Sequence, residues 1–198
     1  MNLPKPLPNQ PALLKHNDAR SLFHELGHAI HIQTTRTRYS AFHGTTARDF
    51  VEIPSIMFEN WWWAPSVIKE IGCHYSYLSD SYLEHWKISQ KDAKASQPPQ
   101  QLDDETIENL MKTKHTNEAL ATLKQCHLAM FDMMVYSPKT HEELENMNLV
   151  EIWNKLNSEV TMMEGMENIG GGWEWGHGCS RFRAYMGGYD AGYYAYPL

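Results

Sequence analysis

FHELGHAIH, residues 23–31, holds two histidines four residues apart, with a glutamate directly after the first. On a helix, residues i and i+4 lie one above the other, so His24 and His28 can direct two ring nitrogens at one point. Zinc binds such nitrogens at about 2.0–2.1 Å, which this spacing satisfies without bending the backbone. Glu25 lies about 100° around the helix, where its carboxylate can reach a metal-bound water without being a ligand. The stretch therefore predicts a zinc-binding helix.

The competing interpretation is a polar stripe on an ordinary helix. The chain contains 11 His and 16 Glu, and at these frequencies the pattern arises by chance in roughly one chain of twenty. A catalytic zinc ion needs a third protein ligand and an open position. A carboxylate on a second helix would therefore strengthen the metal interpretation.

Glu52 is the best candidate for this third ligand. It follows His28 by 24 residues, after a loop with Gly44 that is long enough to turn the chain, and it lies where helical spacing restarts. Asp49 and Glu59 share its face, at offsets of three and seven. Either could accept the second ring N–H of a ligand histidine and fix its orientation. The alternative for both is a capping or solvated carboxylate.

Other histidines are weaker ligand candidates. His31 lies on the same face as His24 and His28, but three histidines on one helix cannot surround a tetrahedral ion well. Six other histidines stand alone, and for these a surface role or a hydrogen-bonded core role is expected: His43, His74, His85, His115, His127 and His141.

Composition indicates a globular, intracellular protein. The 198 residues are 42% hydrophobic and carry a formal net charge of -7, which gives no electrostatic footprint for nucleic acid or an anionic membrane. Peptides or small molecules are the expected partners. Three scattered cysteines form neither a disulfide framework nor a CxxC zinc site. The Pro-rich N-terminus lacks a secretory signal, and no apolar run is long enough for a membrane span. We expect a cytoplasmic location.

The hydrophobic patterns predict an all-α fold. A helix capped by Asn17 or Asp18 runs through residue 35, with Leu22, Leu26, Ala29 and Ile30 as its apolar face. Further helices are expected over 49–63, over 66–90 and over 113–135. Pro54 is tolerable only in the first turn of the first of these. Asp103 and Thr140 are each expected to cap the start of another helix, and Thr140 opens a capping box. We treat residues 1–198 as a single domain, with a flexible Gly-rich loop at 165–180.

Several ordered motifs resemble one family. HELGHAIH followed by RDFVEIPSIMFENW (48–61), HYSYLSD, TKHTNEALATLKQCHLAMFD and the terminal MGGYDAGYYAY are similar to the zinc metallopeptidases of the thimet oligopeptidase family. This family includes neurolysin, saccharolysin, oligopeptidase A and mitochondrial intermediate peptidase, and the fungal, saccharolysin-like members look nearest. The resemblance covers nearly the whole chain. It implies a zincin-like helical catalytic core, one zinc ion per chain, short peptides as substrates, and a cytoplasmic or mitochondrial location.

The resemblance also implies roles for individual residues. His24, His28 and Glu52 match the family's zinc ligands, and Glu25 matches its general base and acid. Tyr189 and Tyr196 match tyrosines that stabilise the tetrahedral oxyanion. One departure concerns Ala184, which occupies the position of a family histidine that also contacts the oxyanion. Losing one such donor costs about 10²–10³ in rate.

A second departure concerns length, because family members are several times longer and have helical layers that wall a deep channel. We therefore expect a partial peptidase domain with exposed apolar surface, including Trp61, Trp62, Trp63 and the methionines. The sequence leaves the oligomeric state open.

Three functions remain after this comparison. The first is a zinc metalloendopeptidase acting on short, unstructured peptides. The second is a catalytically impaired zinc-binding remnant or interaction protein, motivated by Ala184. The third is a non-haem iron oxygenase that uses two histidines and a carboxylate, which ranks last because Glu25 would have no task in it.

Overall fold

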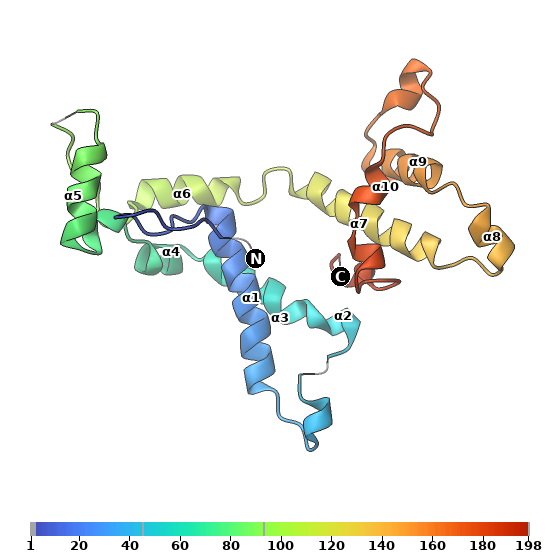
Figure 1. Cartoon of the computed structure of the whole chain (residues 1–198), viewed down its shortest axis with the longest axis horizontal. Helices are drawn as coiled ribbons and strands as arrows, with labels where there is room; N and C mark the ends of the chain where they lie inside the picture. Colours follow the sequence, from blue (N-terminus) through green and yellow to red (C-terminus); the bar gives the residue numbers. More distant parts are fainter. Residues whose placement is uncertain (1–2, 45, 93, 198) are drawn as a thin grey trace. The chain divides into compact units, whose positions relative to one another are not determined.

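Helices are the main regular structure of this chain. The computed structural model describes residues 3–44, 46–92 and 94–197, and Figure 1 shows them as helices joined by loops. The strand-like feature among these residues is one isolated bridge between Leu7 and Gln10. The predicted all-α class is confirmed.

Backbone contacts divide the chain into two compact units. Unit 1 comprises Met1–Thr45 and Ile53–Thr116, and unit 2 comprises Thr46–Glu52 and Asn117–Leu198. The helices of unit 1 are α1 (His16–Thr34), η1 (Ser40–Phe42), α3 (Ile53–Trp62), α4 (Pro65–Ile71), η2 (Tyr75–Tyr77), α5 (Asp80–Ser89) and α6 (Asp104–Thr113). Those of unit 2 are α2 (Arg48–Val51), α7 (Glu118–Val135), α8 (His141–Glu145), α9 (Leu149–Thr161), η3 (Met166–Ile169), α10 (Gly178–Arg181), η4 (Ala184–Met186) and η5 (Tyr193–Ala195).

The N-cap of helix α1 lies two residues before Asn17, the earlier of the two predicted caps. Lys15 is the N-cap, and the carboxylate of Asp18 accepts the Lys15 backbone N–H at 2.9 Å. Asp18 thus stabilises the helix start from inside the first turn, because its carboxylate satisfies a donor that the helix leaves unpaired.

Gly27 allows α1 and α3 to pack at close range (Figure 1). A Cβ atom at Gly27 would lie 2.6 Å from the Ser55 Cα and 2.8 Å from the Pro54 carbonyl oxygen. Ser55 is fully buried at this crossing. Ala19 and Gly27 are buried in α1, whereas Leu22 and Leu26, on the predicted apolar face, are exposed.

Substitution of Gly27 by alanine is expected to destabilise the chain by about 1–3 kcal/mol, because the methyl group forces the two helices apart. Urea denaturation followed by circular dichroism measures this loss. Gln33→Ala, at an exposed site of the same helix, is the matched control and should leave the midpoint unchanged. Equal midpoints for Gly27→Ala and the wild type would contradict the close packing.

The helix predicted over residues 66–90 is wrong, because the chain breaks between α4 and α5. The backbone N–H of His74 donates to the Gln100 carbonyl oxygen at 2.8 Å and not to a carbonyl of its own helix. A new helix then starts at Ser79, whose hydroxyl accepts the Tyr82 N–H. The predicted cap at Asp103 is confirmed, with its carboxylate 2.7 Å from the Thr106 nitrogen.

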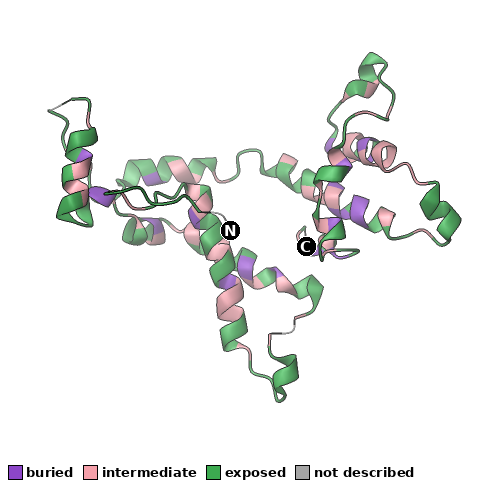
Figure 2. Ribbon diagram, viewed as in Figure 1, coloured by how far each residue is buried: buried purple, intermediate pink, exposed green. Residues whose placement is uncertain are grey.

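The core of unit 2 lies between α7 and α9. Phe131, Leu156, Cys179 and Tyr185 are buried together there, with Trp153 packed against them. The predicted start of α8 at Thr140 is confirmed, since its hydroxyl accepts the Glu143 N–H at 3.1 Å. Figure 2 shows how few residues of either unit are buried.

Hydrogen bonds hold part of the Gly-rich segment at 165–180 to α9. The Asn154 side-chain amide donates to the carbonyl oxygens of Trp173 and Trp175, each at 2.8 Å. The Trp175 indole in turn donates to Glu167 at 3.0 Å. Glycines permit the intervening turns, because Gly170, Gly172 and Gly176 all have positive φ, which glycine adopts without a steric penalty.

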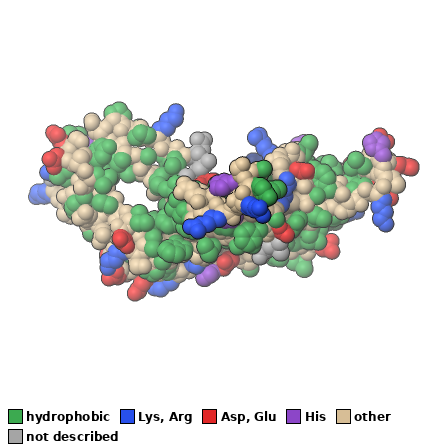
Figure 3. Space-filling view, turned by 90° about the horizontal axis from the view of Figure 1, so that it is seen from below, with side chains coloured by type: hydrophobic (Ala, Val, Ile, Leu, Met, Phe, Trp, Pro, Cys, Tyr) green, Lys and Arg blue, Asp and Glu red, His purple; other side chains and the backbone are tan. Residues whose placement is uncertain are grey.

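Apolar side chains cover much of the visible surface (Figure 3). Trp61 is 59% exposed, and most of the methionines are also exposed. Trp62 and Trp63 are half-buried and pack against the ring of His16. The described helices include none with the length and apolar character needed to cross a membrane.

Candidate metal centre

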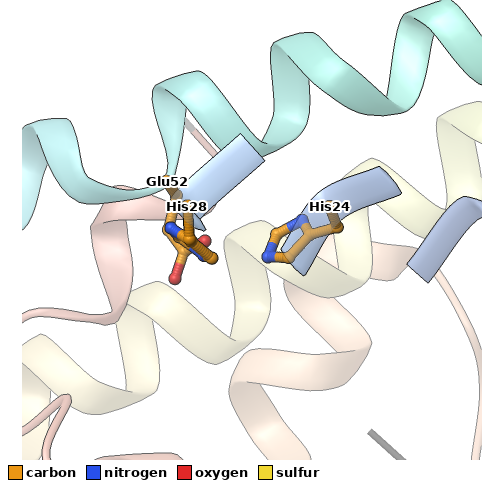
Figure 4. Close-up of side chains that lie close together, drawn as sticks. All are labelled: His24, His28 and Glu52. Carbon is orange, nitrogen blue, oxygen red and sulfur yellow. The ribbon is translucent and has the colours of Figure 1, made fainter. Parts of the chain in front are cut away.

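His24 and His28 project from consecutive turns of α1, and Glu52 directly precedes the first residue of α3. Each offers one ligand atom, and these atoms lie within 4.8 Å of one another. Figure 4 shows the three side chains close together. Within residues 3–44, 46–92 and 94–197, no other group of three His, Cys, Asp or Glu side chains meets this distance criterion.

The donor set fits a zinc ion. Two imidazole nitrogens and one carboxylate oxygen are the ligands of a known class of catalytic zinc site, which keeps a fourth position open. Glu52 is only 2% exposed. A buried carboxylate is stabilised by a cation or by hydrogen-bond donors, and Glu52 has the Tyr189 hydroxyl as a donor and the two histidines close by.

Glu59 lies beside the first histidine. Its Oε1 is 2.8 Å from Nδ1 of His24. Because an ionised carboxylate only accepts hydrogen bonds, Nδ1 carries the proton and the lone pair of the neutral ring is on Nε2. This contact orients Nε2 of His24 as the metal-binding nitrogen.

Arg20 extends this chain of contacts and was missed in the sequence. Its Nε donates to Oε2 of Glu59 at 2.5 Å, so both oxygens of that carboxylate are engaged. The spacing could have indicated this role, because Arg20 precedes His24 by four residues and shares its face of α1. Arg20 and His24 thus hold one carboxylate between them.

Glu25 faces solvent at the edge of the same cluster. It is exposed and lines a cavity of about 290 Å³ that opens beside the first histidine. The cavity is bounded by Asn17, Arg20, Ser21, His24, Glu25 and Glu59. A carboxylate here can exchange protons with water or with a molecule that enters the cavity.

Two further candidates lie outside this arrangement. Asp49 is exposed in the first turn of α2, where a negative charge stabilises a helix N-terminus. His31 follows on α1, one turn after His28, and is not part of the ligand group. The structure thus places Glu59 beside a ligand histidine and Asp49 at a helix start.

Tyr189 and Tyr196 lie beside Glu52 in unit 2. The Tyr189 hydroxyl donates to Glu52 Oε1 at 2.5 Å, and the ring centroids of the two tyrosines are 5.1 Å apart. Burial, and next the hydrogen bonds with Tyr189 and Glu52, raise the pKa of the Tyr196 hydroxyl. Burial and the bond to Glu52 also raise the pKa of Tyr189. Both hydroxyls therefore remain protonated donors at neutral pH.

These tyrosines belong to the tyrosine segment, which we define as residues 184–196. Its first residue, Ala184, accepts the Tyr189 backbone N–H at 3.1 Å through its carbonyl oxygen. The Ala184 side chain carries no hydrogen-bond donor. The segment therefore presents hydroxyl donors only from its tyrosines.

The chain is similar to proteins of known families. The family model described as peptidase family M3 matches residues 1–197. The chain is 41% identical over its whole length to "Oligopeptidase PhomG'" of Diaporthe leptostromiformis, covering 16% of that protein. It is 33% identical to saccharolysin of Saccharomyces cerevisiae over 98% of the chain and 24% of that protein. Oligopeptidase A of Haemophilus influenzae is 28% identical over 98% of the chain and 25% of that protein. The chain thus spans about a quarter or less of these relatives.

Proposed function

Because this chain belongs to peptidase family M3, we propose that it is a zinc-dependent oligopeptidase core that hydrolyses peptide bonds in short peptides. The relatives named above are oligopeptidases and saccharolysin, and their names support the reaction class. The single observation that carries the proposal is the cluster of His24, His28 and Glu52, with Glu25 exposed beside it. Nucleic acid and membranes are not among the proposed partners.

His24, His28 and Glu52 would hold the zinc ion. When bound, zinc lowers the pKa of a water ligand towards about 7 and polarises a substrate carbonyl. Glu59 and Arg20 would fix the ring of His24, since the Glu59 carboxylate accepts from Nδ1 and the Arg20 guanidinium holds that carboxylate in place. The protein thus orients its ligand before the metal binds.

Glu25 would move the proton. Its carboxylate accepts a proton from the attacking water and returns it to the departing amine, which a group in contact with solvent and the cavity can do. Tyr189 and Tyr196 would donate hydrogen bonds to the negative oxygen that develops on the substrate carbonyl. The Tyr189 proton, which Glu52 accepts in this structure, would turn from Glu52 to that oxygen. The raised pKa values of the two hydroxyls support this role, because only a protonated hydroxyl donates.

Replacing Glu59 with glutamine is expected to weaken zinc binding about 10- to 100-fold, because the amide carries no charge and can turn its NH₂ group towards His24. Competition with a chromophoric chelator measures the dissociation constant. Glu70→Gln, at an exposed position of α4, is the control and should bind zinc as the wild type does. A Glu59→Gln constant within twofold of wild type would overturn the orienting role.

Hydrolysis of a short peptide with a fluorophore and a quencher at its ends tests the proposed activity. We expect turnover that a chelator removes and that added zinc restores. A chain that holds one zinc ion but shows no chelator-sensitive turnover would refute the peptidase proposal.

Ala184 favours a second candidate, a zinc-binding protein that does not turn over peptides. Its methyl side chain cannot replace the hydrogen-bond donor of the histidine that thimet oligopeptidase-like proteins have at this position. One missing oxyanion donor costs about 10²–10³ in rate. The same assay separates the two candidates, because both predict one bound zinc ion and only the peptidase predicts cleavage.

A further inference from the structure

Asp132 is a fully buried carboxylate in the last turn of α7, with 0% of its surface exposed. Both of its oxygens bind the backbone of the tyrosine segment. Oδ1 accepts the Ala191 N–H at 3.1 Å, and Oδ2 accepts the Tyr193 N–H at 3.0 Å. A buried charge persists only where such bonds compensate it, so the carboxylate and the segment depend on each other.

The segment needs an external support at this point. The Gly192 N–H donates to the Tyr189 carbonyl oxygen at 2.9 Å and closes a tight turn. Ala191, inside this turn, has φ +52°, a left-handed conformation that residues with a Cβ atom rarely adopt. Asp132 bonds to the strained residue itself and to the second residue after it. Its carboxylate therefore offsets the strain of the turn.

A second side chain of α7, and that of Tyr136 directly after the helix, bind the same segment. Gln125 Oε1 accepts the Tyr193 hydroxyl at 3.0 Å, and the Tyr136 hydroxyl donates to the Tyr185 carbonyl oxygen at 2.5 Å. Offsets of seven and four place Gln125, Asp132 and Tyr136 on one helix face. The tyrosine segment is thus held along one side by a single helix.

The other side of the turn contacts α2 and Glu52. The Arg48 guanidinium lies 5.8 Å from the Tyr189 ring centroid, and the Tyr189 hydroxyl donates to Glu52. The hydrogen bond from the Gly192 N–H to the Tyr189 carbonyl oxygen closes the turn that contains Ala191. A shift of Ala191 or Tyr193 would therefore also move Tyr189. The buried carboxylate is therefore linked through the backbone to the tyrosine beside the candidate ligand.

We propose that Asp132 is a positioning residue that fixes the tyrosine segment and thereby places the Tyr189 hydroxyl at Glu52. The catalytic consequence rests on the proposed peptidase function, whereas the structural consequence does not. Asp132 touches no substrate in this account and acts only through the two backbone amides. Its loss should therefore affect the rate of turnover more than peptide binding.

Amide hydrogen exchange of the full-length wild-type chain is the first test. The Ala191 and Tyr193 amides should exchange at least about 100-fold more slowly than in an unstructured peptide, because both are bonded to a buried carboxylate. Unprotected exchange at both amides would overturn the proposal without any variant. This measurement stands even if a substituted chain does not fold.

The second test uses Asp132→Asn, which keeps the shape but turns an NH₂ group towards one of the two N–H groups. Exchange at Ala191 and Tyr193 should accelerate at least about tenfold while the amides of α9 stay protected, and kcat should fall at least about tenfold with KM within about twofold. Glu159→Gln, exposed on α9, is the matched control and should change neither.

Faster exchange throughout α7 and α9 would reduce Asp132 to a general stability role and overturn the proposal, as would unchanged exchange at both amides. Changed exchange with unchanged kcat in an active chain would also overturn it. If the wild-type chain shows no turnover, the proposed function fails, and the exchange rates alone decide whether Asp132 fixes the segment.

Discussion

Replacing Glu25 with glutamine should lower kcat/KM for a short fluorogenic peptide at least about 100-fold while the chain still binds one zinc ion. Glutamine has the same size but cannot accept a proton at neutral pH, so the proposed proton transfer is lost. The residue is exposed, and the change therefore leaves packing intact. Initial rates and metal content of the same sample measure the two effects together.

Glu84→Gln is the matched control for this prediction. It makes the same chemical change at an exposed position of α5 and should retain wild-type activity and zinc. A Glu25→Gln chain with more than half of the wild-type rate would show that another group moves the proton. Loss of zinc in Glu25→Gln would instead assign this carboxylate to the metal ligands.

Loss of a ligand should have the second large effect. His28→Ala and Glu52→Gln are each expected to weaken zinc binding at least about 100-fold, because each removes one of three protein ligands from the ion. Glu52→Gln preserves the shape of this buried side chain and so limits the effect on folding. Metal content after dialysis against a weak chelator measures the loss, and circular dichroism verifies the helices.

His43→Ala provides the control for the ligand variants. His43 is exposed in the loop after η1, outside the ligand group, and its removal should leave the zinc content unchanged. Equal zinc loss in His43→Ala and His28→Ala would indicate scattered surface binding. Retention of zinc by both ligand variants would place the ion elsewhere.

Local patterns predicted much of the fold because the forces behind them are local. The caps at Asp103 and Thr140 depend on side chains that bond to N–H groups three residues away, and such contacts can be recognised in a sequence. The i, i+4 spacing of His24 and His28 likewise placed both rings on one face of α1. The position of Glu52 followed from Pro54, which permits a helix only near its start.

Contacts between distant segments were not predictable in this way. The break after α4 depends on a bond between His74 and Gln100, whose pairing no local pattern indicates. Asp132 likewise appeared as one polar residue in an amphipathic helix, although its partners lie about sixty residues later. Periodicity identifies the faces of a helix, but the packing of its neighbour decides which face is buried.

Helix α1 illustrates this last point. Leu22 and Leu26 lie on its predicted apolar face, yet they are 43% and 44% exposed. Gly27 is buried instead, and the absence of a Cβ atom there lets α3 approach closely.

An anomalous difference map, from a crystal grown with zinc and measured at the zinc absorption edge, would locate the metal ion. We expect one strong peak per chain, bonded at about 2.0–2.2 Å to a ring nitrogen of His24, a ring nitrogen of His28 and the carboxylate of Glu52. No peak at these residues, or a peak bonded to other side chains in their place, would contradict this prediction.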